Sequence, residues 1–317
     1  MTTLNLSAEE HSSYNYYPRT MIRLCAISYD DFYSIPGEVQ QLGWEVVWGP
    51  AELVSWLDIS YSLAFICRRQ RSSAPDEYTV VIRGTNMMSW DSWEKEDFAI
   101  GSTRPFNELA PHAPANALIS HGTYRGTLDL LRLRDPYQNT SIVDFLTNAK
   151  PPVLYVTGHS LGGTLSPPLF AYLNDVLYGG NYVHNMALWT FAGLTPGDVN
   201  FNTYFNSLFN PQFPWRLHNN LDIAPFCWWS EDNIKNIYRA NSLNWGWPED
   251  DLMESLFDRA RGKNYAQPLG NQVLLGTFNN EIIDEYVWTA QAMYQHHVST
   301  YQTLVDTAYP EILASSA

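Results

Sequence analysis

Short apolar runs alternate with longer segments of helical spacing along most of the chain. The runs predict strands at 44–48, 63–68, 78–82, 153–157, 187–192, 215–218 and 273–276. The longer segments predict helices at 17–32, 122–134, 164–177, 251–262 and 282–308. Residues 86–120 are irregular, and polar loops are expected after 187–192 and 215–218. Strands that alternate with helices indicate an α/β fold, with a mostly parallel central sheet and helices on both faces.

The chain shows no linker, internal repeat or low-complexity tract that would divide it. Its 317 residues are enough to bury a substantial core. We therefore expect one domain over residues 1–317 rather than two smaller ones.

The charge balance excludes one class of partner. A net charge of −15 leaves no basic stripe that would displace counterions from phosphates, so a nucleic-acid partner is not expected. The same charge gives no attraction to anionic membranes, and any lipid contact would have to be apolar. No apolar run approaches the roughly 18 residues of a membrane-spanning helix, so no transmembrane segment is expected.

Two features bear on the compartment. The stretch MTTLNLSAEEHSSYNYYPRT lacks the charged and apolar regions of a Sec signal peptide, which leaves the cytoplasm or export by a non-Sec route. Cys25, Cys67 and Cys227 are widely spaced and form neither a CxxC pair nor a zinc-binding spacing. Reduced and mostly buried thiols are expected.

One serine lies in a pattern that suggests chemistry. The predicted strand at 153–157 leads into Gly158-His159-Ser160-Leu161-Gly162, and a predicted helix follows. This context favours a nucleophile elbow, in which the glycines permit a tight turn and the helix N-terminus supplies positive potential. The alternatives are a serine that caps the helix and a phosphate-binding loop, but GxxxxGK[ST] is absent. His159 is expected to pack within the elbow rather than to act as a second base.

A nucleophilic serine needs a general base and an acid that orients it. In an elbow of this kind the order along the chain is serine, acid, histidine. Of the histidines after Ser160, only the pair His296 and His297 comes late enough to leave room for the acid. Asp198 and Asp222 both follow predicted strands, and spacing alone leaves the choice between them open.

Six segments in order resemble one family, the class 3 (fungal-type) lipases of the α/β-hydrolase superfamily, and within it a bacterial-like branch. They are VVIRGT (80–85), SHGTYRG (120–126), VTGHSLGGTLS (156–166), WTFAGLTPG (189–197), NNLDIAPF (219–226) and HHVSTYQTLV (296–305). Leu194 departs from the pattern, where serine or proline is frequent. The resemblance implies an α/β-hydrolase fold with a lid segment.

The resemblance also implies roles for particular residues. Ser160 would be the nucleophile, Asp222 rather than Asp198 the acid, and His296 the base, while His297 fits the pattern less well. The backbone N–H groups of Thr85 and Leu161 would form the oxyanion hole, and Tyr301 would be the aromatic residue after the base.

Two long intervals suggest additions around the site. The interval 86–118 holds apolar side chains interrupted by acids, which favours an amphipathic lid that makes transient contact with a lipid interface. A fixed surface helix is the alternative. The interval 223–295 separates the acid from the base and is a candidate cap insertion.

The resemblance implies a serine carboxylic-ester hydrolase that acts on lipid esters through an acyl-enzyme, as a triacylglycerol lipase or esterase in lipid degradation. No metal and no organic cofactor is implied. Phospholipase A1 activity, in an exported toxin for example, is the nearest alternative. A catalytically silent member that binds lipid or protein through the same cleft is a further one.

Overall fold

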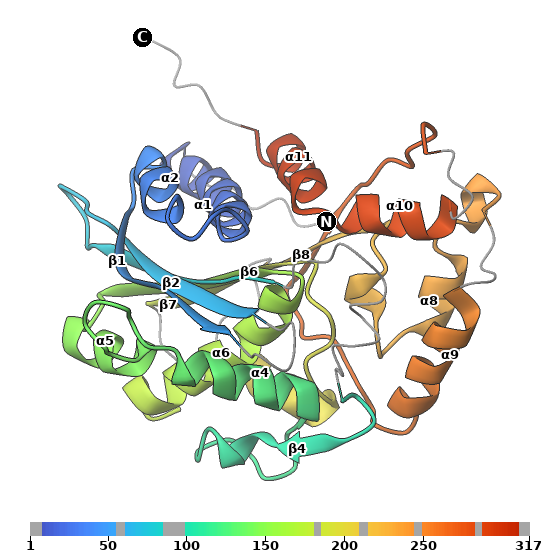
Figure 1. Ribbon diagram of the computed structural model, residues 1–317, viewed down its shortest axis with the longest axis horizontal. Helices are drawn as coiled ribbons and strands as arrows, with labels where there is room; N and C mark the ends of the chain where they lie inside the picture. Colours follow the sequence, from blue (N-terminus) through green and yellow to red (C-terminus); the bar gives the residue numbers. More distant parts are fainter. Residues whose placement is uncertain are drawn as a thin grey trace.

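A central sheet of seven strands runs through the described part of the chain, in the order β1-β2-β3-β6-β7-β8-β9 (Figure 1). The computed structural model describes residues 8–54, 61–84, 99–180, 185–208, 215–243, 249–282 and 287–310. The strands are β1 (Glu45–Val54), β2 (Tyr61–Arg69), β3 (Glu77–Ile82), β6 (Val153–His159), β7 (Met186–Phe191), β8 (Arg216–Asn219) and β9 (Asn271–Leu274). β1, β2 and β3 pair antiparallel, whereas every pair from β3 to β9 is parallel.

Helices cover both faces of this sheet, as expected. On one face lie α1 (Ala8–Ile27), α2 (Ile35–Gln41) and α11 (Val298–Ala308), and on the other α4 (His121–Arg132), α5 (Ile142–Ala149) and α6 (Leu161–Tyr178) (Figure 1). α8 (Glu231–Asn236), α9 (Glu249–Ala260) and α10 (Val287–His296) gather at one end of the sheet. The fold is that of an α/β-hydrolase.

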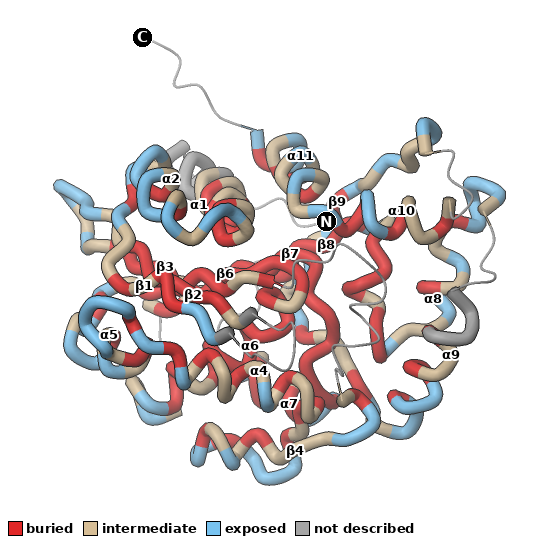
Figure 2. The backbone as a smooth tube through the Cα atoms, viewed as in Figure 1, coloured by how far each residue is buried: buried red, intermediate tan, exposed pale blue. Residues whose placement is uncertain are grey.

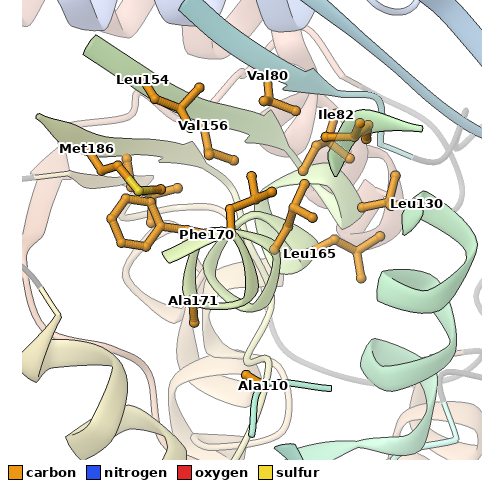
Figure 3. Close-up of a cluster of buried hydrophobic side chains, with 14 of the residues drawn as sticks. Val80, Ile82, Ala110, Leu130, Leu154, Val156, Leu165, Phe170, Ala171 and Met186 are labelled. Carbon is orange, nitrogen blue, oxygen red and sulfur yellow. The ribbon is translucent and has the colours of Figure 1, made fainter. Parts of the chain in front are cut away.

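Alternating side chains of the central strands build two cores. Val80 and Ile82 of β3 belong to the core under α4 and α6, whereas Val81 belongs to the core under α1 and α11. Successive residues of a strand point to opposite faces, so a strand buried on both faces is apolar throughout. Figure 3 shows the first core, with Leu165 and Phe170 of α6 against the strands. Figure 2 shows the buried strands between helices with exposed outer faces.

A third cluster of buried side chains joins α8, α9 and α10. It includes Ile234, Phe257 and Trp288, and it reaches Leu194 just after β7. β9, from within the predicted cap interval 223–295, pairs with β8 in the central sheet. The interval is therefore not one excursion from the fold, and only the part around α8 and α9 stays a candidate cap.

Several elements differ from the sequence prediction. The predicted helix at 282–308 is two helices, α10 and α11, because His297 between them has extended backbone with φ −62° and ψ 139°. A helix, α7 (Val199–Ser207), stands where a polar loop was expected. The short helices α2, α5 and α8 were not predicted, since one or two turns are too few to show a 3.6-residue period.

The predicted lid interval is described only in part. Residues 86–98 lie outside the described residues. The remainder forms a second sheet of β4 (Thr103–Pro105) and β5 (Leu118–Ser120), with a 3-10 turn, η1 (Phe106–Glu108), after β4. Phe106 is fully buried in the first core. This remainder is therefore part of the body of the fold.

Candidate active site

Ser160 lies on a sharp turn between β6 and α6. Its backbone has φ 59° and ψ −126°, a conformation that costs an L-residue about 1–3 kcal/mol and persists only where its surroundings hold it. The Ser160 N–H donates to the Phe191 carbonyl at 3.0 Å, and the Ser160 carbonyl accepts from the Thr164 N–H at 3.0 Å. The Ser160 side chain accepts no capping hydrogen bond from a backbone N–H among the described residues. The helix-cap alternative is therefore not what the structure shows.

The two glycines of the motif are required by close backbone approach. A Cβ on Gly158 would overlap the backbone of Gly162, and a Cβ on Gly162 would overlap the carbonyl of Ile82. Only glycine lets the strand end, the turn and the first turn of α6 pack this closely.

The structure brings His296 to this serine. His296 Nε2 lies 2.8 Å from Ser160 Oγ. On the other side of the ring, His296 Nδ1 lies 2.9 Å from Asp222 Oδ2 and 3.0 Å from Oδ1. A carboxylate only accepts, so Nδ1 carries the proton and the bare Nε2 faces the hydroxyl. In this arrangement the His296 imidazole can accept the Ser160 hydroxyl proton.

Asp222 is fully buried and held by further donors. The Tyr301 hydroxyl donates to Asp222 Oδ2 at 2.7 Å, and the Ala224 N–H donates to Oδ1 at 3.0 Å. Burial, and then the Asp222 charge, raise the pKa of Tyr301 well above its usual value. Tyr301 therefore remains a donor, and the carboxylate keeps one orientation toward the imidazole.

Asp198, the other acid left open by spacing, is used elsewhere. It is the N-cap of α7, where Oδ1 accepts from the Phe201 N–H at 2.8 Å. The same oxygen accepts from the Leu118 N–H at 3.0 Å, which ties α7 to β5. Asp198 thus joins two elements of the scaffold, whereas Asp222 meets the imidazole.

The remaining histidines have other surroundings. His297 is the N-cap of α11, with Nδ1 at 2.7 Å from Ser299 Oγ, and it is exposed. His218 is buried in β8 against the Phe226 ring. Burial, and then the Arg216 charge, lower the pKa of His218 to about 4. His184 lies outside the described residues.

Of the two predicted oxyanion donors, Leu161 is among the described residues. Leu161 is the first residue of α6, so its N–H belongs to the helix N-terminus beside Ser160. Thr85 lies outside the described residues. Gly84, directly before it, lies against the serine, since a Cβ built on Gly84 would come within 3.0 Å of Ser160 Cβ.

Neither a metal centre nor a membrane span is found among the described residues. They hold no group of three or more His, Cys, Asp or Glu side chains that would bind a metal ion. They also include no helix long and apolar enough to cross a bilayer. Cys25, Cys67 and Cys227 are buried and free, as expected.

Part of the chain matches a known protein family. The family model described as lipase (class 3) matches residues 79–229. This region is similar to the class 3 lipases. It includes the serine elbow and Asp222, whereas His296 lies beyond it and joins them through the fold. No curated protein sequence matches the chain.

Solved structures of lipases have the same fold. The crystal structure of M37 lipase superposes with a TM-score of 0.74 at 27% sequence identity, and covers 94% of this chain and 92% of its own. Lip2 lipase from Yarrowia lipolytica superposes with a TM-score of 0.55 at 16% identity, over 85% of this chain and 80% of its own. The latter likeness concerns the fold alone.

One contact in the site could not be predicted from any sequence motif. His159 was expected to pack within the elbow, and its ring does lie beside His296, with centroids 5.1 Å apart. Its partner Tyr29, whose hydroxyl lies 2.9 Å from His159 Nδ1, was not anticipated. These residues are 130 positions apart, and no motif connects them.

Proposed function

We propose that the protein is a serine carboxylic-ester hydrolase that acts on lipid esters. The observation that carries the proposal is the buried contact series from Ser160 Oγ through His296 to Asp222. Serine, imidazole and carboxylate in hydrogen-bond reach make an alcohol of ordinary pKa nucleophilic at neutral pH.

In the proposed reaction Ser160 Oγ attacks the ester carbonyl while His296 Nε2 takes the hydroxyl proton. Asp222 keeps the imidazole in the required tautomer and stabilises the imidazolium that forms. The oxyanion accepts hydrogen bonds from the Leu161 N–H and from Thr85, donors typically worth about 3–4 kcal/mol each. His296 then protonates the leaving alcohol, and water activated by the same imidazole hydrolyses the acyl-enzyme. No step uses a metal or an organic cofactor.

Lipid esters are proposed as substrates because both kinds of comparison support them. The family match and M37 lipase, at 27% identity over most of both chains, both concern lipases. Within this class we propose carboxylic esters with medium or long acyl chains, triacylglycerols among them.

The test is hydrolysis of an ester series from acetyl to palmitoyl, with phosphatidylcholine alongside, by wild type, Ser160→Ala and the exposed control Ser102→Ala. Turnover that peaks at longer chains and falls by about 10⁶-fold in Ser160→Ala alone supports the proposal. Preference for phosphatidylcholine would assign a phospholipase instead. Folded wild-type protein that turns over none of them would contradict hydrolysis and favour a silent binder.

A further inference from the structure

The candidate base lies where one helix ends and the next begins. His296 is the last residue of α10, and the chain turns into α11 through the extended His297. The last carbonyls of a helix are satisfied by side chains, water or neighbouring elements rather than by the helix itself. Yet a base must keep its Nε2 within about 3 Å of the hydroxyl that it deprotonates.

A second histidine, His159, contacts the backbone carbonyl of this base. His159 is the last residue of β6, directly before Ser160, and is 3% exposed. Its Nε2 lies 2.9 Å from the His296 backbone oxygen. A carbonyl oxygen only accepts, so Nε2 carries the hydrogen and donates. The residue next to the nucleophile thereby holds the backbone of the base.

Tyr29 fixes the state of this second histidine. Its hydroxyl lies 2.9 Å from His159 Nδ1 and 3.5 Å from the His159 carbonyl oxygen. Burial, and then the His296 charge, lower the pKa of His159 well below its usual value, so the ring is neutral. With Nε2–H given to His296, Nδ1 is bare and accepts the Tyr29 O–H.

The Tyr29 hydroxyl also lies against the backbone of Gly84, directly before Thr85. A Cβ on Gly84 would overlap the Tyr29 oxygen. Tyr29 follows the end of α1. One side chain therefore touches the predicted oxyanion loop and the residue before Ser160, and through that residue it reaches the base.

We propose that Tyr29 and His159 are positioning residues of the hydrolysis. The series Tyr29 O–H to His159 Nδ1, and His159 Nε2–H to the His296 carbonyl, fixes the base relative to β6 and hence to Ser160. Neither residue touches the reacting atoms, and the proposal rests on the proposed function.

The test is Tyr29→Phe, which removes one oxygen, against Tyr33→Phe, whose side chain is 86% exposed. On a soluble p-nitrophenyl ester we expect kcat of Tyr29→Phe to fall about tenfold, the factor that one lost buried hydrogen bond typically produces. KM should stay within about twofold, because no substrate contact is removed. Tyr33→Phe should match wild type.

A double-mutant cycle with His159 separates positioning from packing. His159→Gln keeps an N–H donor for the His296 carbonyl, whereas His159→Met does not, so His159→Gln should retain more kcat. Tyr29→Phe should cost little further kcat in the His159→Met background, because the two side chains act in series. Fully additive losses would overturn the proposal.

Thermal melting completes the test. If Tyr29→Phe keeps the wild-type kcat, the positioning role is overturned, whether or not the melting temperature falls. The proposed hydrolase activity is not affected by that outcome. Wild-type protein without Ser160-dependent turnover would overturn both. These two failures are distinct, because the Ser160→Ala comparison is made on wild type alone.

Discussion

At the residue scale, two adjacent histidines have opposite surroundings. His296 ends α10 with its ring buried between Ser160 and Asp222. The His297 side chain, by contrast, is exposed and caps the N-terminus of α11. The break between the helices rotates consecutive side chains apart, so one of the pair meets the serine and the other meets solvent.

This difference predicts distinct outcomes of substitution. His296→Ala should lower kcat by about 10⁶-fold, because the general base is lost. His297→Ala should keep kcat and lower the free energy of unfolding by about 1 kcal/mol, as expected for a lost helix cap. Ester turnover and urea unfolding of both variants check this. Full activity in His296→Ala would transfer the role of base to His297.

At the element scale, the site depends on where strands and helices end. Ser160 follows the carboxyl end of β6 and Asp222 follows that of β8. Both strands are parallel members of one sheet, so their carboxyl ends lie at the same edge. Asp198 follows β7 at this edge too, but it starts α7 instead.

The two acids should therefore respond differently to substitution. Asp198→Ala removes the cap of α7 and its bond to β5, and should lower the free energy of unfolding by about 1–2 kcal/mol with kcat nearly unchanged. Asp222→Asn should lower kcat by about 10⁴-fold, because an amide favours the wrong imidazole tautomer. Kinetics and urea titration distinguish them. A folded but inactive Asp198→Ala would contradict the assignment.

At the scale of the whole molecule, burial of neutral histidines links stability to pH. His218 lies in the central sheet at 6% exposure, and His159 is buried beside the site. The pKa of each is lowered, chiefly by burial. The unfolded chain therefore takes up protons at a higher pH than the fold does, so acid favours unfolding.

For His218 the window lies between about 6.5, the ordinary pKa, and about 4 in the fold. Stability from its neutral form is complete above this window and is lost as the pH falls through it. At about pH 4.5 the loss should be about 2 kcal/mol. Urea unfolding at about pH 7 and about pH 4.5 should show a smaller decline for His218→Gln than for wild type. Equal declines would show that His218 does not contribute.

Local pattern alone was enough to predict most of the scaffold and the candidate nucleophile, Ser160. Strands such as β3 and β6 are recognisable because burial on both faces makes them apolar throughout. The elbow is recognisable because Gly158, Ser160 and Gly162 are neighbours in the chain. Short helices such as α5 escaped prediction, as did the break at His297, because neither changes the local hydrophobic period enough to be seen.

Tertiary structure decided which distant side chains meet. Spacing left Asp198 and Asp222 open; the fold brings Asp222 to His296 and places Asp198 at the start of α7. The contact between Tyr29 and His159 joins the end of α1 to the end of β6 across 130 residues. Such contacts depend on how helices pack on the sheet, which no local sequence pattern records.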